Sequence, residues 1–158
     1  MRRFSRIFAW TTLFFVAGAV LFFTKAAALP YKVAWPVLLL SLATFLSRRR
    51  ELLPFGFAFL FSAAGDAVGA RGLFIPQMAF FALAHVAYVC WFLPRARRRL
   101  RAVSLAVTVP LLVFLFAAIV PEAPFPAERI GVAVYGLVIA AMLYSALQYD
   151  GACAAGFR

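Results

Sequence analysis

Few ionisable side chains in this sequence lie inside apolar stretches, and Asp66 is the clearest of them. It occurs in FSAAGDAVGA, residues 61–70, within a run built largely from Phe, Leu, Ala and Gly. A carboxyl group in lipid is costly unless it is paired or protonated, so an acid in this setting is a candidate for function. Ser62 lies one helical turn before it, and the pair Gly65 and Gly69 would let a neighbouring helix approach closely. We expect Asp66 to face protein, either as a reacting acid or as a hydrogen-bond partner of another helix.

His85 is the only histidine and the second candidate. Gln77 and Phe81 precede it at steps of four residues and Tyr88 follows at three, so one helix face carries a polar stripe. An imidazole can carry a proton near neutral pH or donate an orienting hydrogen bond. His85 is therefore interpreted either as a proton carrier or as a neutral histidine bonded across the bundle.

Two weaker candidates lie in other apolar runs. Lys32 stands at the start of a run, on the same predicted membrane side as Asp66. Its ammonium group could bind a phosphate head group, pair with Asp66, or extend to water from the helix end. Tyr135 is a candidate for substrate contact, although a tyrosine near a membrane interface commonly acts as an anchor.

The sequence carries no motif typical of a metal or an organic cofactor. Cys90 and Cys153 are isolated, and no CxxC or HExxH motif is present. The glycines of GDAVGARG follow no predicted strand, so they do not indicate a phosphate-binding loop. We expect neither a cofactor nor a metal site.

The composition predicts the elements that must position these residues. Of 158 residues, 66% are hydrophobic and 13% are charged, more apolar than a soluble domain of this size can bury. Backbone groups in lipid must bond within helices or closed barrels, and no period-two alternation indicates strands. We predict an all-α, polytopic transmembrane bundle, a single domain over residues 1–158. Its helices are expected near 7–29, 32–47, 53–70, 73–94, 102–120 and 129–148.

The net charge of +11 is interpreted as a topology signal, not as a nucleic-acid surface, because the cations lie in short gaps between apolar runs. Twelve cations fall on one predicted side and four on the other, which places the N-terminus in the cytoplasm. We expect a multi-pass protein of a bacterial inner (plasma) membrane, with membrane lipids as partners and no nucleic acid. The gap 95–101 could also touch anionic head groups. The twelve are Arg2, Arg3, Arg6, Arg48, Arg49, Arg50, Arg95, Arg97, Arg98, Arg99, Arg101 and Arg158, and the four are Lys25, Lys32, Arg71 and Arg129.

Three stretches resemble the YhhN family of lysoplasmalogenase-like membrane proteins. The first is YKVAWPVLLLSLAT, from Tyr31. The second and strongest is FAFLFSAAGDAVGARGLFIPQMAFFALAHVAYVCWF, with a Gly-Asp segment followed one helix later by an Ala-His-x-x-Tyr segment. The third is VAVYGLVIAAMLYSAL. Together they cover residues from about 31 to 147 in the family's order.

The resemblance implies a hydrolase that cleaves the vinyl ether bond of a lysoplasmalogen, a lysophospholipid substrate. The products would be a fatty aldehyde and glycerophosphoethanolamine or glycerophosphocholine. In this reading Asp66 is the acid, His85 orients water or relays a proton, and Lys32 holds the phosphate. Ser62, Tyr88 and Tyr135 would contact the substrate.

The sequence also departs from the family pattern. Members usually have about eight helices, with a second Asp in a Ser-Asp setting on a late helix, whereas this chain ends after the sixth run. Val33 follows Lys32 where the family favours proline. The chain therefore resembles a C-terminally shortened member, and without the second carboxylate it is expected to be inactive, to work with another subunit, or to be truncated. A homo-oligomer is a possible assembly. Two other functions stay open: a non-catalytic lipid-binding or regulatory protein, and a small proton-coupled transporter using Asp66 and His85.

Overall fold

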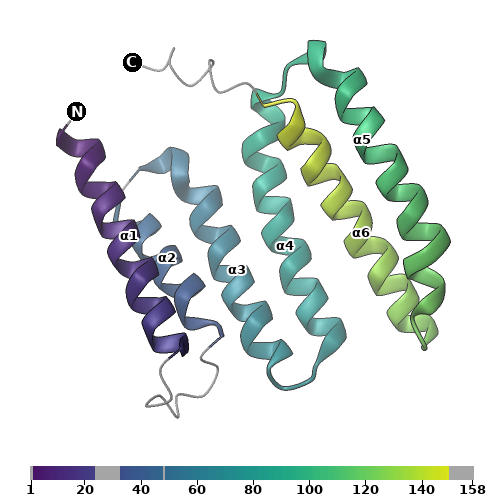
Figure 1. The fold of residues 1–158 in the computed structure, drawn as a ribbon, viewed down its shortest axis with the longest axis horizontal. Coiled ribbons are helices and arrows are strands. Elements are labelled where there is room, and N and C mark those ends of the chain that lie inside the picture. Colours follow the sequence, from purple (N-terminus) through teal and green to yellow (C-terminus); the bar gives the residue numbers. More distant parts are fainter. Residues whose placement is uncertain (1, 24–32, 48, 150–158) are drawn as a thin grey trace. The chain divides into compact units, whose positions relative to one another are not determined.

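The computed structural model describes residues 2–23, 33–47 and 49–149 (Figure 1). These residues form six α-helices, four 3-10 turns and one π-helical turn. The chain divides into two compact units, Met1–Ala84 and His85–Arg158, and helix α4 (Phe74–Phe92) contributes residues to both. The two units are described in turn.

The first unit is a layer of neighbouring helices. It contains α1 (Arg2–Phe23), α2 (Trp35–Leu46), α3 (Leu53–Gly69) and the first part of α4. Helix α1 packs against α2, and α2 packs against α3 (Figure 1). Both α2 and α3 have a proline in their first turn, where no helical hydrogen bond requires its missing N–H. A turn with Gly72 at φ 74°, a conformation that favours glycine, follows α3.

Small residues allow close helix contacts in the first unit. A Cβ atom added to Gly18 would lie 2.6 Å from the Cα atom of Pro36, so α1 and α2 touch through their backbones. On the other side of α2, Ser41 is almost fully buried and its Oγ donates a 2.8 Å hydrogen bond to the carbonyl oxygen of Gly56. Contacts of this kind hold membrane helices together, because lipid supplies no hydrophobic force between them.

The second unit is organised by the pairing of α5 with α6. After α4 come the 3-10 turns Leu93–Arg95 and Arg98–Leu100, then α5 (Arg101–Phe114), which continues as a π-helical turn, Leu115–Ile119. A 3-10 turn, Val120–Glu122, leads to α6 (Pro126–Leu147). Helix α5 packs against α6.

Two buried serines in the second unit donate to carbonyl oxygens three or four residues earlier in the chain. The hydroxyl of Ser104 donates to the Leu100 carbonyl oxygen at 2.9 Å, and that of Ser145 donates to the Met142 carbonyl oxygen at 2.8 Å. Such bonds satisfy a hydroxyl without a partner on another helix. The hydroxyl of Thr108 is buried and has no hydrogen-bond partner within the described segments.

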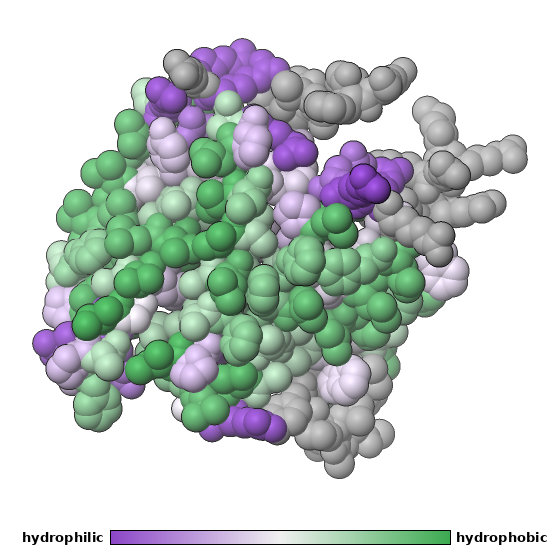
Figure 2. Space-filling view, turned by 180° about the vertical axis from the view of Figure 1, so that it is seen from behind, coloured by the Kyte–Doolittle hydropathy of each residue, from purple (hydrophilic) through white to green (hydrophobic). Residues whose placement is uncertain are grey.

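The distribution of side chains is that of a protein surrounded by lipid. Buried hydrophobic residues are mostly alanines, such as Ala58, Ala84 and Ala140, whereas many Phe, Leu and Val side chains point outward. Hydrophobic side chains cover much of the surface seen in Figure 2. Among the residues that the structure describes, four segments are long and apolar enough to cross a membrane, and α2 is a shorter apolar helix. The four are Arg50–Gly69, Phe74–Arg95, Arg101–Glu122 and Pro126–Leu147.

These findings confirm the predicted all-α membrane fold. The described helices follow the six predicted apolar runs, with α1 beginning already at Arg2 and α6 at Pro126. The early start of α1 has a simple reason: arginines continue a helix well, so an apolar run marks the part that lies in lipid and not the whole helix. The single-domain assignment and the cytoplasmic N-terminus stay predictions.

Candidate functional site

Asp66 lies on the face of α3 that meets α4 within the first unit. Ser62, Gly65, Asp66 and Gly69 share this face, because they are spaced at three and four residues. A Cβ atom on Gly65 would lie 3.1 Å from the nearest ring atom of Phe81. One turn further along α3, Gly69 meets Gln77 of α4. Gly65, beside Asp66, and Gly69, one turn later, are thus two positions where α3 contacts side chains of α4.

Gln77 is the α4 residue next to Gly69. A Cβ atom on Gly69 would lie 2.5 Å from its side-chain nitrogen and 2.7 Å from its side-chain oxygen. The amide therefore covers the glycine one turn from Asp66. The sequence pattern placed Gln77 on a polar stripe, but it did not show which residue of α3 that stripe would meet.

The carboxyl group of Asp66 is half-buried and is not held in a tight pair. Its side chain makes no hydrogen bond or ion pair within the described part of the chain, whereas its backbone carbonyl oxygen accepts the Ala70 N–H at 2.9 Å. An acid whose oxygens are not occupied by neighbouring donors can exchange a proton with a bound molecule. The role of Asp66, as a reacting acid or as a hydrogen-bond partner of another helix, stays a prediction.

His85 lies in an aromatic cluster in the second unit. The centre of its ring is 6.2 Å from that of Tyr88 and 5.6 Å from that of Tyr135, with an angle of 81° between the ring planes in both pairs. Edge-to-face contacts of this kind are favourable for aromatic rings. All three side chains are half-buried. Because Tyr135 belongs to α6, the cluster joins α4 to α6 and places an imidazole near two phenols.

At the residue after Tyr135, α6 closely contacts the π-helical turn that continues α5. A Cβ atom on Gly136 would overlap the side chain of Leu115, lying 3.0 Å from its Cγ atom and closer to its Cδ2 atom. Gly136 and Ala140 are both buried and four residues apart. This small-xxx-small spacing was the sequence signal that could have identified the packed face of α6.

The structure sorts the predicted site residues into two groups. Asp66 and Ser62 share a face of α3 in the first unit, and His85, Tyr88 and Tyr135 form the cluster of the second unit. Lys32 lies outside the described residues. The meeting of Lys32, Asp66 and His85 in one site stays a prediction.

The fold and these side chains define a multi-pass α-helical integral membrane protein with a partly buried acid and histidine. The model of the YhhN family matches residues 24–157, a range that contains both groups. The chain therefore belongs to the YhhN family, as the three stretches of sequence predicted. No curated protein and no solved structure matches it.

Proposed function

We propose that this protein is a membrane hydrolase of the lysoplasmalogenase type, which cleaves the vinyl ether bond of a single-chain phospholipid. The observation that carries the proposal is the carboxyl group of Asp66, half-buried at a close helix contact and engaged by no hydrogen bond or ion pair among the described residues. Membership of the YhhN family supports the same reading. A single-chain lipid could reach such a group laterally from the bilayer.

The first step of vinyl ether cleavage requires an acid that donates a proton. Asp66 donates its proton to the β-carbon of the vinyl ether, and the electron pair of the double bond forms the new C–H bond. The resulting oxocarbenium ion is captured by water, which loses a proton to the Asp66 carboxylate. The hemiacetal hydroxyl then loses its proton as the bond from the same carbon to the glycerol oxygen breaks, and the glycerol oxygen takes up a proton. The products are a fatty aldehyde and glycerophosphoethanolamine or glycerophosphocholine. A carboxylic acid that stays protonated near neutral pH can perform this step, as acids in apolar sites do in other enzymes.

The remaining candidates take supporting roles in this proposal. His85 orients the attacking water or relays its proton, and the hydroxyl groups of Tyr88 and Tyr135 help to hold the water or the substrate. Ser62 contacts the substrate beside Asp66, and Lys32 binds its phosphate.

The test is the release of fatty aldehyde from lysoplasmalogen by the purified protein. We expect Asp66→Asn to lower the rate by about 10²–10⁴-fold, the usual contribution of a positioned general acid. Glu122→Gln, a matched change at an acid after α5, should leave the rate unchanged. The saturated ether analogue should give no aldehyde, because it has no double bond to protonate.

Three outcomes would contradict the proposal in different ways. Equal release by the parent protein and Asp66→Asn would remove Asp66 from the mechanism. Release by neither would favour a non-catalytic lipid-binding protein of the same family. Proton-coupled uptake into vesicles, abolished by Asp66→Asn, would indicate a transporter.

A further inference from the structure

The end of α4 is closed by an arginine that folds back on its own helix. The Nη1 atom of Arg95 donates a 2.7 Å hydrogen bond to the carbonyl oxygen of Trp91, and its guanidinium carbon lies 4.6 Å from the centre of the Trp91 ring. The first contact satisfies a carbonyl at the helix end, and the second is a cation–π interaction. The guanidinium group of Arg95 therefore contacts Trp91 of the same chain.

The segment 95–101, which we call the basic loop, is also fastened to the end of α6. The ring of Tyr149 lies 5.1 Å from that of Trp91 and 5.7 Å from that of Phe92, measured between ring centres. An isolated β-bridge joins Ala96 to Tyr149, and the N–H of Arg97 donates to the Gln148 carbonyl oxygen at 2.9 Å. The backbone of the basic loop is therefore held in one place.

The basic loop concentrates positive charge. It contains five arginines and no acidic residue, and the first turn of α5 adds no acid. Arg101 begins α5, where the helix dipole is also positive, and both Arg99 and Arg101 are exposed. An anion near these arginines would be stabilised.

The position of the basic loop in the chain indicates which class of anion it would bind. It connects two segments that can cross a membrane, Phe74–Arg95 and Arg101–Glu122, so it lies where a bilayer has its head groups. Trp91 and Tyr149 are residues that favour this depth. We propose that the basic loop binds the head group of an anionic glycerophospholipid, with Arg99 and Arg101 contacting its phosphate. This proposal does not rest on the hydrolase function.

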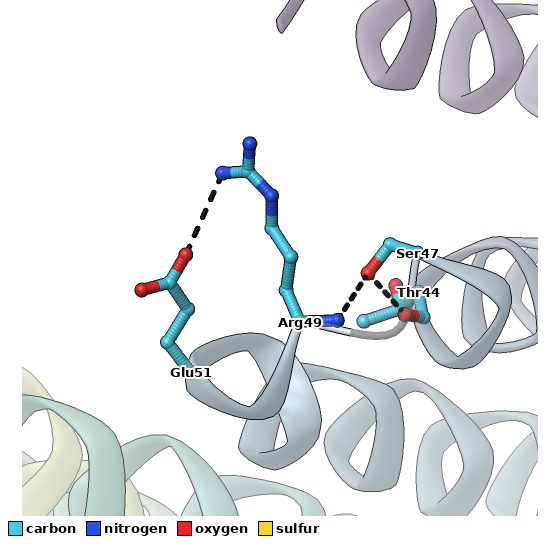
Figure 3. A network of polar contacts seen from close by, with 4 residues as sticks. All are labelled: Thr44, Ser47, Arg49 and Glu51. Carbon is cyan, nitrogen blue, oxygen red and sulfur yellow. Dashed lines mark hydrogen bonds and ion pairs between the residues drawn. The ribbon is translucent and has the colours of Figure 1, made fainter. Parts of the chain in front are cut away.

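The other described arginine cluster differs in a way that supplies a control. There Nη1 of Arg49 lies 3.5 Å from Oε1 of Glu51, so an acid of the chain already accompanies the cations (Figure 3). The N–H of Arg49 donates to Oγ of Ser47 at 3.4 Å, and that hydroxyl donates to the Thr44 carbonyl oxygen (Figure 3). This cluster has the same residue type at a helix end but a lower net charge.

Trp91 provides a direct readout of lipid at the basic loop. In a Trp10→Phe/Trp35→Phe background it is the remaining tryptophan. The protein is reconstituted in phosphatidylcholine vesicles that contain increasing amounts of brominated phosphatidylglycerol or, separately, brominated phosphatidylcholine. Quenching of Trp91 fluorescence then gives the relative affinity of the two lipids. We expect a preference of at least about fivefold for phosphatidylglycerol, since each arginine near an anionic surface contributes about that factor.

In the variant Arg99→Gln/Arg101→Gln, the preference for phosphatidylglycerol over phosphatidylcholine should fall by up to about 30-fold. The helical circular dichroism should be unchanged. Arg99→Lys/Arg101→Lys should retain it, because the charge remains. Arg49→Gln/Arg50→Gln should also retain it.

Four results would overturn the proposal: equal quenching by the two lipids, an unchanged preference in the glutamine variant, loss of the preference in the lysine variant, or an equal loss in the Arg49/Arg50 control. Displacement of the brominated lipid by inorganic phosphate at the same phosphate concentration would assign the site to small anions and refute a lipid site.

Discussion

Gly56→Ala tests whether α2 and α3 are held together by a close backbone approach. A Cβ atom at Gly56 would lie 2.8 Å, 3.0 Å and 3.1 Å from three ring atoms of Phe45. Non-bonded carbon atoms normally stay about 3.5–4.0 Å apart, so the overlap is about 0.5–1 Å. The overlap is relieved if the Phe45 ring turns aside or if α3 separates from α2 by a similar distance.

The same movement would damage a hydrogen bond. The Oγ of Ser41 reaches the Gly56 carbonyl oxygen at 2.8 Å, and a separation of the helices would stretch this distance toward about 3.5 Å, where little of the bond remains. Overpacking costs about 1–3 kcal/mol, and a hydrogen bond between membrane helices contributes about 0.6 kcal/mol. Alanine regains up to about 1 kcal/mol of helix propensity. We expect a net loss of about 2 kcal/mol in the free energy of unfolding.

The assay is reversible unfolding in mixed micelles, followed by circular dichroism, for a double-mutant cycle. Gly56→Ala should cost less in a Phe45→Leu background, because the clashing ring is gone, and also less in a Ser41→Ala background, because the hydrogen bond is already absent. The reasoning is refuted if Gly56→Ala is neutral or stabilising in the parent protein, or if its cost is the same in all three backgrounds.

Other positions allow shorter tests. Gly136→Ala should destabilise the protein by about 1–3 kcal/mol, since its Cβ atom would overlap Leu115, and a Leu115→Ala background should reduce this cost in the same unfolding assay. Gly72→Ala should cost about 1 kcal/mol from backbone strain alone at φ 74°, with no packing change; an unchanged unfolding free energy would contradict that conformation. Tyr135→Phe should leave stability within about 0.5 kcal/mol because the ring contact with His85 remains, whereas aldehyde release should fall if the hydroxyl takes part; a stable variant with full activity would exclude that role. Arg95→Gln should lower the unfolding free energy by about 1–2 kcal/mol through loss of the charged hydrogen bond, and an unaltered value would show that the contact contributes nothing.

The membrane fold and the family could be predicted from the sequence because their signals are strong. Long apolar runs leave helices as the solution in lipid, and the segment around Asp66 is distinctive. The close approach of another helix beside Asp66 could also be predicted, because glycines four residues apart are a known pattern of helix contact.

The contacts between particular helices were harder to predict. In lipid, a helix face that meets protein and a face that meets acyl chains are both apolar, so periodicity does not separate them. The contact between His85 and Tyr135 could therefore not be predicted and is seen only in the structure. The same holds for the π-helical turn Leu115–Ile119 that continues α5. Whether Asp66 and His85 act together depends on contacts that no sequence pattern specifies.

The buried positions filled by alanine, glycine and serine have a consequence for how this sequence can change over time. An exchange of Phe for Leu on the lipid-facing surface alters little, whereas a methyl group added at Gly18 would overlap the backbone of Pro36. Selection should therefore act most strictly on the smallest side chains and leave the large ones free to drift. A distant relative would be recognised by where it keeps its small residues.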